Sequence, residues 1–208
     1  MFQNRLDAAQ ALINPLSAYR HHPEGVILAI PRGGLEIGHA LSQSLHLPLD
    51  VILTKKIGYP GNKEFAIGSV SLKSLLIDPP YLETFSDYIA DEAASIRALL
   101  KKRYQAYLGD RLPISLQDKR VILTDDGVAT GNTLFSAIDL VKQESPQEII
   151  VAIPVSPPDT LLRLKDQVDT VICLLSPHHF QAVGQFYEDF RQVDDQEAIR
   201  LLRDSHAL

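Results

Sequence analysis

The chain alternates short apolar runs with segments of helical periodicity. Apolar runs of strand length occupy residues 26–30, 121–124, 148–154 and 170–175, and a helical pattern follows each of the first three. This alternation is typical of parallel strands joined by crossover helices. The chain has 208 residues, the usual size of a single domain. We therefore expect an α/β fold in which a central, mostly parallel sheet has helices on both faces.

The remaining segments predict what surrounds this sheet. Helical periodicity covers residues 4–18, and residues 50–54 form a further strand. Lys55 to Phe65 is polar and rich in glycine and proline, which predicts a loop. Residues 66–72 and 75–77 alternate as a hairpin or as edge strands, residues 81–108 form one long helical pattern, and a last helix begins near Asp194 or Asp195.

Composition argues against several classes of function. The net charge is -6 and no basic run is present, which argues against a nucleic-acid partner. No stretch of 18 apolar residues occurs, and Met1 to Arg5 lack the apolar core of a signal peptide, so we expect a cytoplasmic protein without a membrane segment. The single cysteine, Cys173, lies in an apolar run and predicts a small buried side chain rather than a nucleophile.

The segment from Val121 to Thr133 carries the most specific chemistry in the chain. An apolar strand leads into the adjacent carboxylates of Asp125 and Asp126, and a short loop of Gly, Thr and Asn then opens a helix. Free backbone N–H groups at a helix start bind phosphate. The two carboxylates upstream can hold the hydroxyls of a sugar, or a metal. The combination predicts a site for a ribose 5-phosphate.

The segment Pro31-Arg32-Gly33-Gly34 follows the first strand and opens a helix. Ligands bind at the carboxyl ends of parallel strands, so this segment lies at a candidate ligand-binding edge. Backbone N–H groups of Gly33 and Gly34 can face an anion there, and Arg32 adds a fixed positive charge. The adjacent glycines do not have the G-x-G-x-x-G spacing of a dinucleotide fingerprint.

Two later segments are less specific. Lys55 to Glu64 leaves a strand end, and its polarity and glycines suit either a mobile loop that closes over substrate or an ordinary solvated excursion. Residues 176–187 follow the last strand and are rich in aromatic and polar side chains. These side chains suit a planar ring that stacks and accepts hydrogen bonds, and packing of the tail onto the core explains the phenylalanines as well.

Taken together, these segments resemble the type I phosphoribosyltransferases, enzymes that use 5-phosphoribosyl 1-pyrophosphate (PRPP). The run from Asp125 to Thr133 is similar to the family's signature, and the four segments stand in the family's order over about residues 26–190. The pattern Phe2, Arg5, Ala8 resembles an uncharacterised branch of predicted phosphoribosyltransferases rather than a named salvage enzyme.

The resemblance implies one domain over residues 1–208. Its core would cover about residues 20–175, and a small hood would be formed by the N-terminal segment and about residues 176–208. The resemblance also implies a homodimer. These are expectations about the whole chain, separate from the roles of single residues.

The resemblance assigns a role to each motif. Asp125 and Asp126 would bind the ribose 2- and 3-hydroxyls and orient magnesium or its waters. Arg32 would bind the departing pyrophosphate, and a cis peptide bond before it would turn the amides of Gly33 and Gly34 toward that group. Asp125, Asp126 and Arg32 would thus be the catalytic residues. The other implied positions are a 5-phosphate loop (Ala129, Thr130, Gly131, Asn132 and Thr133), flexible-loop lysines (Lys55, Lys56 and Lys63) and an acceptor surface (Phe180, Phe186 and Tyr187).

The implied reaction is a pentosyl transfer of nucleotide metabolism. A nitrogen nucleophile, such as a nucleobase or a related ring, displaces pyrophosphate from C1 of PRPP with inversion. Mg2+ is the implied cofactor, because it neutralises the charge of the leaving group. The sequence does not identify the general base, for which His178 and His179 of the implied hood are the candidates.

The acceptor and the activity itself stay open at this point. Hypoxanthine-guanine members of the family carry an acidic residue near N7 of the purine where this chain has Ala129. The alternative is a catalytically silent regulator, which would bind PRPP or a nucleotide with Mg2+ and release no pyrophosphate. A dehalogenase-like phosphatase requires a second Asp two residues after the first, where this chain has Gly127.

Overall fold

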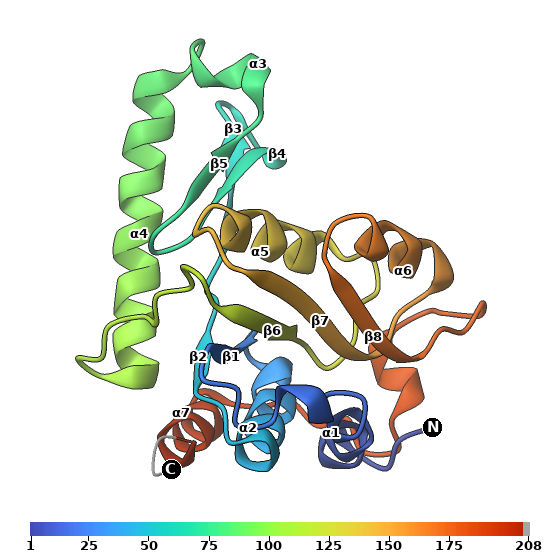
Figure 1. Ribbon diagram of the computed structural model, residues 1–208. Helices are drawn as coiled ribbons and strands as arrows, with labels where there is room; N and C mark the ends of the chain where they lie inside the picture. The colour runs from blue at the N-terminus through green and yellow to red at the C-terminus, as the bar shows by residue number, and fades with distance from the viewer. Residues whose placement is uncertain (206–208) are drawn as a thin grey trace.

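In the computed structural model of the chain, which describes residues 1–205, a five-stranded parallel sheet forms the centre (Figure 1). Its strands lie in the order β2-β1-β6-β7-β8, and every neighbouring pair is parallel. Strands buried on both faces are apolar almost throughout, which is why the sequence shows them as continuous runs. The predicted α/β architecture is confirmed. The strands are β1 (Gly25–Ala29), β2 (Leu49–Val51), β6 (Arg120–Thr124), β7 (Glu148–Val155) and β8 (Thr170–Leu175).

Helices cover both faces of this sheet (Figure 1). Successive side chains of a strand point to opposite faces. Ile27 and Ile122 therefore belong to the core under α1, α2 and α7, and Leu28 and Leu123 to the core under α5 and α6. The helices are α1 (Arg5–Ile13), α2 (Gly33–Leu45), α5 (Asn132–Lys142), α6 (Pro158–Lys165) and α7 (Asp195–Asp204), with 3-10 turns at Ser17–Tyr19 and Val183–Phe186.

The strand order reverses next to β1, whose two neighbours are β2 and β6. Ala29 of β1 is in register with Thr124 of β6, and the Ile30 N–H donates to the Thr124 carbonyl at 3.0 Å. In open α/β sheets, ligands bind beyond the carboxyl ends of the strands at such a reversal. The segment after β1 and the acidic pair after β6 therefore leave the sheet side by side.

The chain between β2 and β6 forms a projecting unit (Figure 1). A three-stranded antiparallel sheet pairs in the order β3-β4-β5, and a long helix runs beside it. The Tyr88 hydroxyl of that helix donates to the carbonyl of Gly58 at 2.9 Å. The elements are β3 (Lys55–Tyr59), β4 (Asn62–Val70), β5 (Leu75–Ile77), α3 (Pro79–Leu82) and α4 (Ser86–Leu108).

Two predictions for this unit are wrong. The polar segment from Lys55 to Phe65 is not a loop but lies in strands β3 and β4, which turn at Gly61 with a φ of +82° that glycine tolerates. The helical pattern over residues 81–108 is broken at Phe85. Phe85 adopts φ -127° and ψ 30°, and its ring packs edge-on against Tyr59 of β3 at 5.2 Å. Tertiary packing thus overrides the local helical period.

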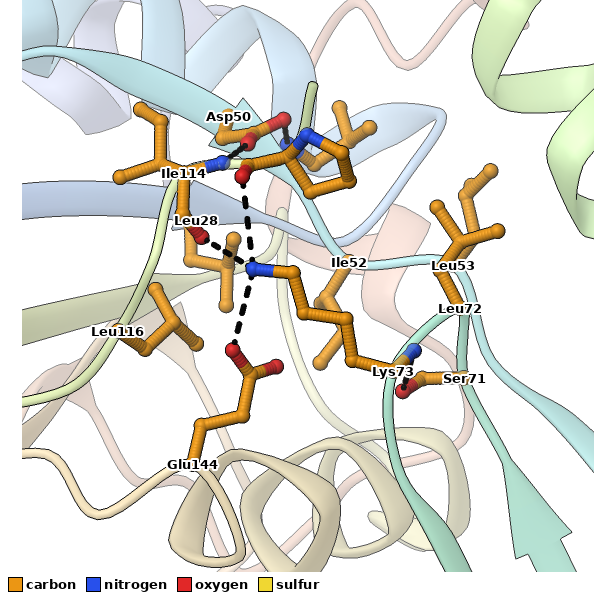
Figure 2. Close-up of a pocket in the computed structure, with 12 residues that line it drawn as sticks. Leu28, Asp50, Ile52, Leu53, Ser71, Leu72, Lys73, Ile114, Leu116 and Glu144 are labelled. Carbon is orange, nitrogen blue, oxygen red and sulfur yellow. Dashed lines mark hydrogen bonds and ion pairs between the residues drawn. The ribbon is translucent and has the colours of Figure 1, made fainter.

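A buried carboxylate ties this unit to the central sheet (Figure 2). Asp50 accepts hydrogen bonds from the Tyr104 hydroxyl at 2.9 Å and from the Ile114 N–H at 2.8 Å. Lys73 donates to the Ile114 carbonyl at 2.9 Å and pairs with Glu144 at 3.3 Å. The cavity between these side chains has a volume of about 30 Å³, which is close to the share of one water molecule. This cluster is therefore a structural link rather than a ligand site.

Candidate functional site

The acidic pair lies directly after β6, at the reversal of strand order. Oδ1 of Asp125 accepts the Asp126 N–H at 2.9 Å. Burial, and then the neighbouring Asp126 carboxylate, raise the pKa of Asp125 well above its ordinary value. Burial also raises the pKa of Asp126, and the Arg5 guanidinium opposes that shift. Two neighbouring carboxylates of like charge repel each other, so the pair favours hydrogen-bond donors or a cation.

Arg5 of α1 contacts this pair from a position 121 residues earlier in the chain. Its Nε and Nη2 both lie 2.8 Å from Oδ2 of Asp126. The side chain of Arg5 is almost fully buried, and the Asp126 side chain is 14% exposed. The ion pair is therefore shielded from solvent screening and fixes the orientation of the carboxylate.

The loop between the acidic pair and α5 borders a cavity of about 140 Å³, lined by Asp125 and residues 127–134. Gly131 precedes α5 with a φ of +78°, a left-handed conformation that favours glycine. Within residues 1–205, the backbone N–H groups of residues 129–133 donate no hydrogen bond to another protein group. The Thr160 hydroxyl fixes the loop by donating to the Ala129 carbonyl at 2.8 Å. The free amides and the helix dipole make this cavity suitable for an anion.

The segment after β1 packs tightly against the acidic pair. The peptide bond between Pro31 and Arg32 is cis, as predicted. Gly34 donates its N–H to the Ile30 carbonyl at 3.1 Å, so this amide is engaged within the protein. An ideal Cβ on Gly33 would overlap the Asp126 carboxylate, and one on Gly34 would lie 2.9 Å from the Thr124 carbonyl oxygen. Space for the acidic pair is thus a reason for both glycines that sequence reasoning did not find.

The C-terminal segment covers the acidic pair from a third side. Tyr187 is buried, and its hydroxyl donates to the backbone carbonyl of Asp126 at 2.5 Å. Phe2 pairs with Tyr187 in a parallel bridge, and its N–H donates to the Phe186 carbonyl at 2.8 Å. Tyr187 therefore supports the acidic pair and is not part of an open acceptor surface, contrary to prediction. Phe180 and Phe186 are half-buried, with ring centres 5.1 Å apart.

The predicted flexible-loop lysines lie on the projecting sheet. Lys55 and Lys56 are exposed on β3, and Lys63 is exposed on β4. Lys63 pairs with Glu92 of α4 at 2.9 Å. In this conformation Lys63 is engaged away from the acidic pair.

Comparison with known proteins decides the family. A model described as "Phosphoribosyl transferase domain" matches residues 3–191. The chain belongs to the phosphoribosyl transferase domain family. The match includes α1, the acidic pair and the C-terminal segment that covers it, so the resemblance predicted from the motifs is confirmed.

Individual relatives agree with this assignment. Two Mycobacterium tuberculosis proteins, from two strains and provisionally named phosphoribosyl transferases, are 31% identical over 210 residues. These matches cover 99% of this chain and 47% of each relative, so the chain spans about half the length of the curated relatives it matches. A crystal structure of a Thermus thermophilus protein is 36% identical, with a TM-score of 0.85 over 98% of each chain. A structure from Aquifex aeolicus (15% identity, TM-score 0.50, 82% of this chain and 71% of that one) shares the fold.

The acidic pair is the part of this phosphoribosyl transferase domain that fits magnesium. Mg2+ takes oxygen ligands, keeps several waters and is commonly held by one or two carboxylates plus substrate phosphates. Residues 1–205 contain no group of three or more His, Cys, Asp and Glu side chains that could hold a metal ion. Asp125 and Asp126, the latter already paired with Arg5, therefore suit an ion that brings most of its ligands from substrate and water.

The sequence did not reveal that Arg5 and Tyr187 contact the acidic pair. Arg5 shares the buried face of α1 with Ala8, Ala9 and Leu12. An arginine on an otherwise apolar helical stripe is rarely fully buried unless it is paired, and this was the available signal. No comparable signal marks Tyr187, because its partner is a backbone carbonyl distant in sequence.

Proposed function

We propose that the chain transfers the phosphoribosyl group of PRPP to a nitrogen acceptor and releases pyrophosphate, with Mg2+ as cofactor. The observation that carries this proposal is that Asp125 and the free amides before α5 border one cavity. A diol-binding group and a phosphate-binding group at this spacing match the two ends of a ribose 5-phosphate. Membership of the phosphoribosyl transferase domain family supports the same substrate.

In this proposal, the chain's own residues bind separate parts of PRPP. The amides of Ala129, Thr130, Gly131, Asn132 and Thr133 bind the 5-phosphate, and this binding energy, remote from the reacting carbon, orients the ribose. Asp125 and Asp126 accept hydrogen bonds from the ring hydroxyls and favour the positive charge that develops at C1. Magnesium, when bound, supplies charge neutralisation to the pyrophosphate. The bond from C1 to the pyrophosphate oxygen breaks as the bond from C1 to the acceptor nitrogen forms.

Arg32 is the residue that we assign to the departing pyrophosphate. Its guanidinium pairs with Asp195 of α7 at 3.5 Å, and both side chains are accessible to solvent, 32% and 66% exposed. An exposed ion pair contributes little to stability, so Arg32 can exchange this partner for a phosphate. Lys55 and Lys56, which are exposed, would be further cations for the same group.

The acceptor is a nucleobase or a related ring, and Phe180 and Phe186 form the proposed surface for it. The experiment is pyrophosphate release from PRPP, measured with individual nucleobases and amines in the presence and absence of Mg2+. Release that requires one acceptor and Mg2+ is the expected result. Binding of PRPP without release for any acceptor would identify a regulator instead of an enzyme.

Two further properties stay predictions. The chain is expected to form a homodimer and to reside in the cytoplasm. In the part of the chain that the structure describes, no helix is long and apolar enough to cross a membrane.

A further inference from the structure

Arg5 is held from several sides by groups of different segments. Its Nη1 donates to Oε2 of Glu36 on α2 at 3.1 Å and to the carbonyl of Arg191 at 2.8 Å. The guanidinium carbon lies 4.0 Å from the ring centre of Phe190. A guanidinium with a ring on its face and acceptors at its edge has one orientation, because its donors form a planar fork.

This orientation of Arg5 gives the two carboxylate oxygens of Asp126 different environments. Nε and Nη2 of Arg5 converge on the same atom, Oδ2, each at 2.8 Å. Gly33 leaves room for that oxygen, since a Cβ there would overlap it. Within residues 1–205, no hydrogen bond from another residue reaches Oδ1 of Asp126. One oxygen is therefore committed to the protein, and the other is free for a ligand.

The carboxylate of Glu36 shares the positive charge of Arg5 with the carboxylate of Asp126. The guanidinium is shared between the Asp126 and Glu36 carboxylates, whose side chains are 14% and 17% exposed. Arg191 also approaches Glu36, at 3.7 Å. Asp126 thus keeps part of its negative character while its orientation is fixed, which suits an acceptor for a sugar hydroxyl.

We propose that Arg5 is a positioning residue for sugar recognition: by occupying Oδ2 of Asp126, it presents Oδ1 to a ring hydroxyl of the substrate. This inference rests on the proposed function and deepens it. Arg5 acts through Asp126 and does not touch the substrate itself. The N-terminal helix thereby contributes to the selection of a ribose with free ring hydroxyls.

The test compares two ligands that share a ring and a phosphate. Ribose 5-phosphate carries the ring hydroxyls, and tetrahydrofurfuryl phosphate lacks them. Dissociation constants for both, at one fixed Mg2+ concentration, are measured by NMR titration for the wild type, Arg5→Met and Arg5→Lys. Arg5→Met should weaken ribose 5-phosphate about tenfold, the factor of one hydrogen bond to a charged group, and leave tetrahydrofurfuryl phosphate unchanged. Arg5→Lys keeps the positive charge but lacks the planar donors of a guanidinium. Its ratio of the two dissociation constants should lie between those of the wild type and Arg5→Met.

The control is Arg120→Met, which removes an arginine that pairs with Glu148 at 2.9 Å at the opposite end of β6. This variant should keep the wild-type ratio of the two dissociation constants. An unchanged ratio in Arg5→Met, or an equal loss for both ligands, would overturn the positioning role. If Arg5→Met does not fold, Arg5→Lys is used in its place. An unchanged ratio of the two dissociation constants in Arg5→Lys would then overturn the positioning role. A wild type that binds both ligands equally would overturn the proposed sugar site and this inference with it.

Discussion

Replacing Gly33 by alanine tests whether glycine is needed there to present its N–H to an anion or to leave space for Asp126. Gly33 is not one of the glycines with a positive φ, so alanine fits its backbone and keeps its N–H. If the residue serves only to present its amide to an anion, alanine is tolerated. The structure indicates instead that a Cβ would overlap Oδ2 of Asp126 and lie 2.5 Å from its Cγ. Asp126 cannot move away freely, because Arg5 holds the same oxygen at 2.8 Å.

The expected magnitude follows from this overlap. Overpacking by one methyl group costs about 1–3 kcal/mol. For a chain of this size, each kcal/mol lowers the midpoint of thermal unfolding by about 2–4 °C, so we expect a decrease of about 2–12 °C. Displacement of the carboxylate should also weaken the binding of ribose 5-phosphate, which NMR titration measures. This ligand carries no pyrophosphate, so its affinity reports on the acidic pair and the 5-phosphate loop, and of these two Gly33 contacts only the acidic pair.

Gly38→Ala is the matched control on the same helix. A Cβ on Gly38 would lie 2.9 Å from Cδ1 of Leu49 and 3.0 Å from Cβ of Ala29, inside the core and away from the carboxylates. It should lower the unfolding temperature without changing the affinity. If Gly33→Ala changes neither the unfolding temperature nor the affinity for ribose 5-phosphate, glycine is not required here to leave room for the Asp126 carboxylate.

Two further substitutions test Tyr187, which supports the acidic pair, and Asp50, which links the projecting unit to the central sheet. Tyr187→Phe removes the hydroxyl that donates to the part-buried Asp126 carbonyl, so the free energy of unfolding in urea should fall by about 1 kcal/mol; an unaltered value would count against this support. Burial raises the pKa of Asp50 above its ordinary value, so as pH rises the unfolded chain releases this proton before the native state does, and the stability contribution of this carboxyl falls. Asp50→Asn removes that fall, so its unfolding free energy relative to the wild type should increase as pH rises above about 4, the ordinary pKa of an aspartate. Parallel pH profiles would contradict the shift.

The central sheet was predictable because its strands β1, β2, β6 and β7 are buried almost throughout. Their apolar runs needed no knowledge of partners, and the half-buried edge strand β8 was predicted to the residue, as Thr170–Leu175. The acidic pair and the loop before α5 were predictable for a related reason. Their chemistry is local, since adjacent carboxylates and a glycine-capped helix start are contiguous in the chain.

The projecting sheet was not predictable in the same way. Lys55, Lys56 and Lys63 are exposed, so the segment from Lys55 to Phe65 shows no buried alternation. β3 pairs with β4, and β4 with β5, but the polarity of the segment by itself favours a loop. The glycine and proline of this segment form the turn of a hairpin, and the same residues are equally common in loops.

The supports of the site depend on contacts between distant segments. Arg5 and Asp126 are 121 residues apart, and Tyr187 and Asp126 are 61 residues apart. The first contact joins α1 to the carboxyl end of β6, and the second joins the C-terminal segment to the same loop. Local patterns identify the chemical groups, and only the fold shows which groups hold them in place.

Binding of PRPP tests the central claim most directly. Isothermal titration of PRPP in the presence of Mg2+ should show binding to the wild type and none to the isosteric variant Asp125→Asn/Asp126→Asn. The unfolding temperature of the variant shows that the fold is intact. Undiminished PRPP binding by the folded variant would contradict the assignment of the acidic pair as the sugar-binding group.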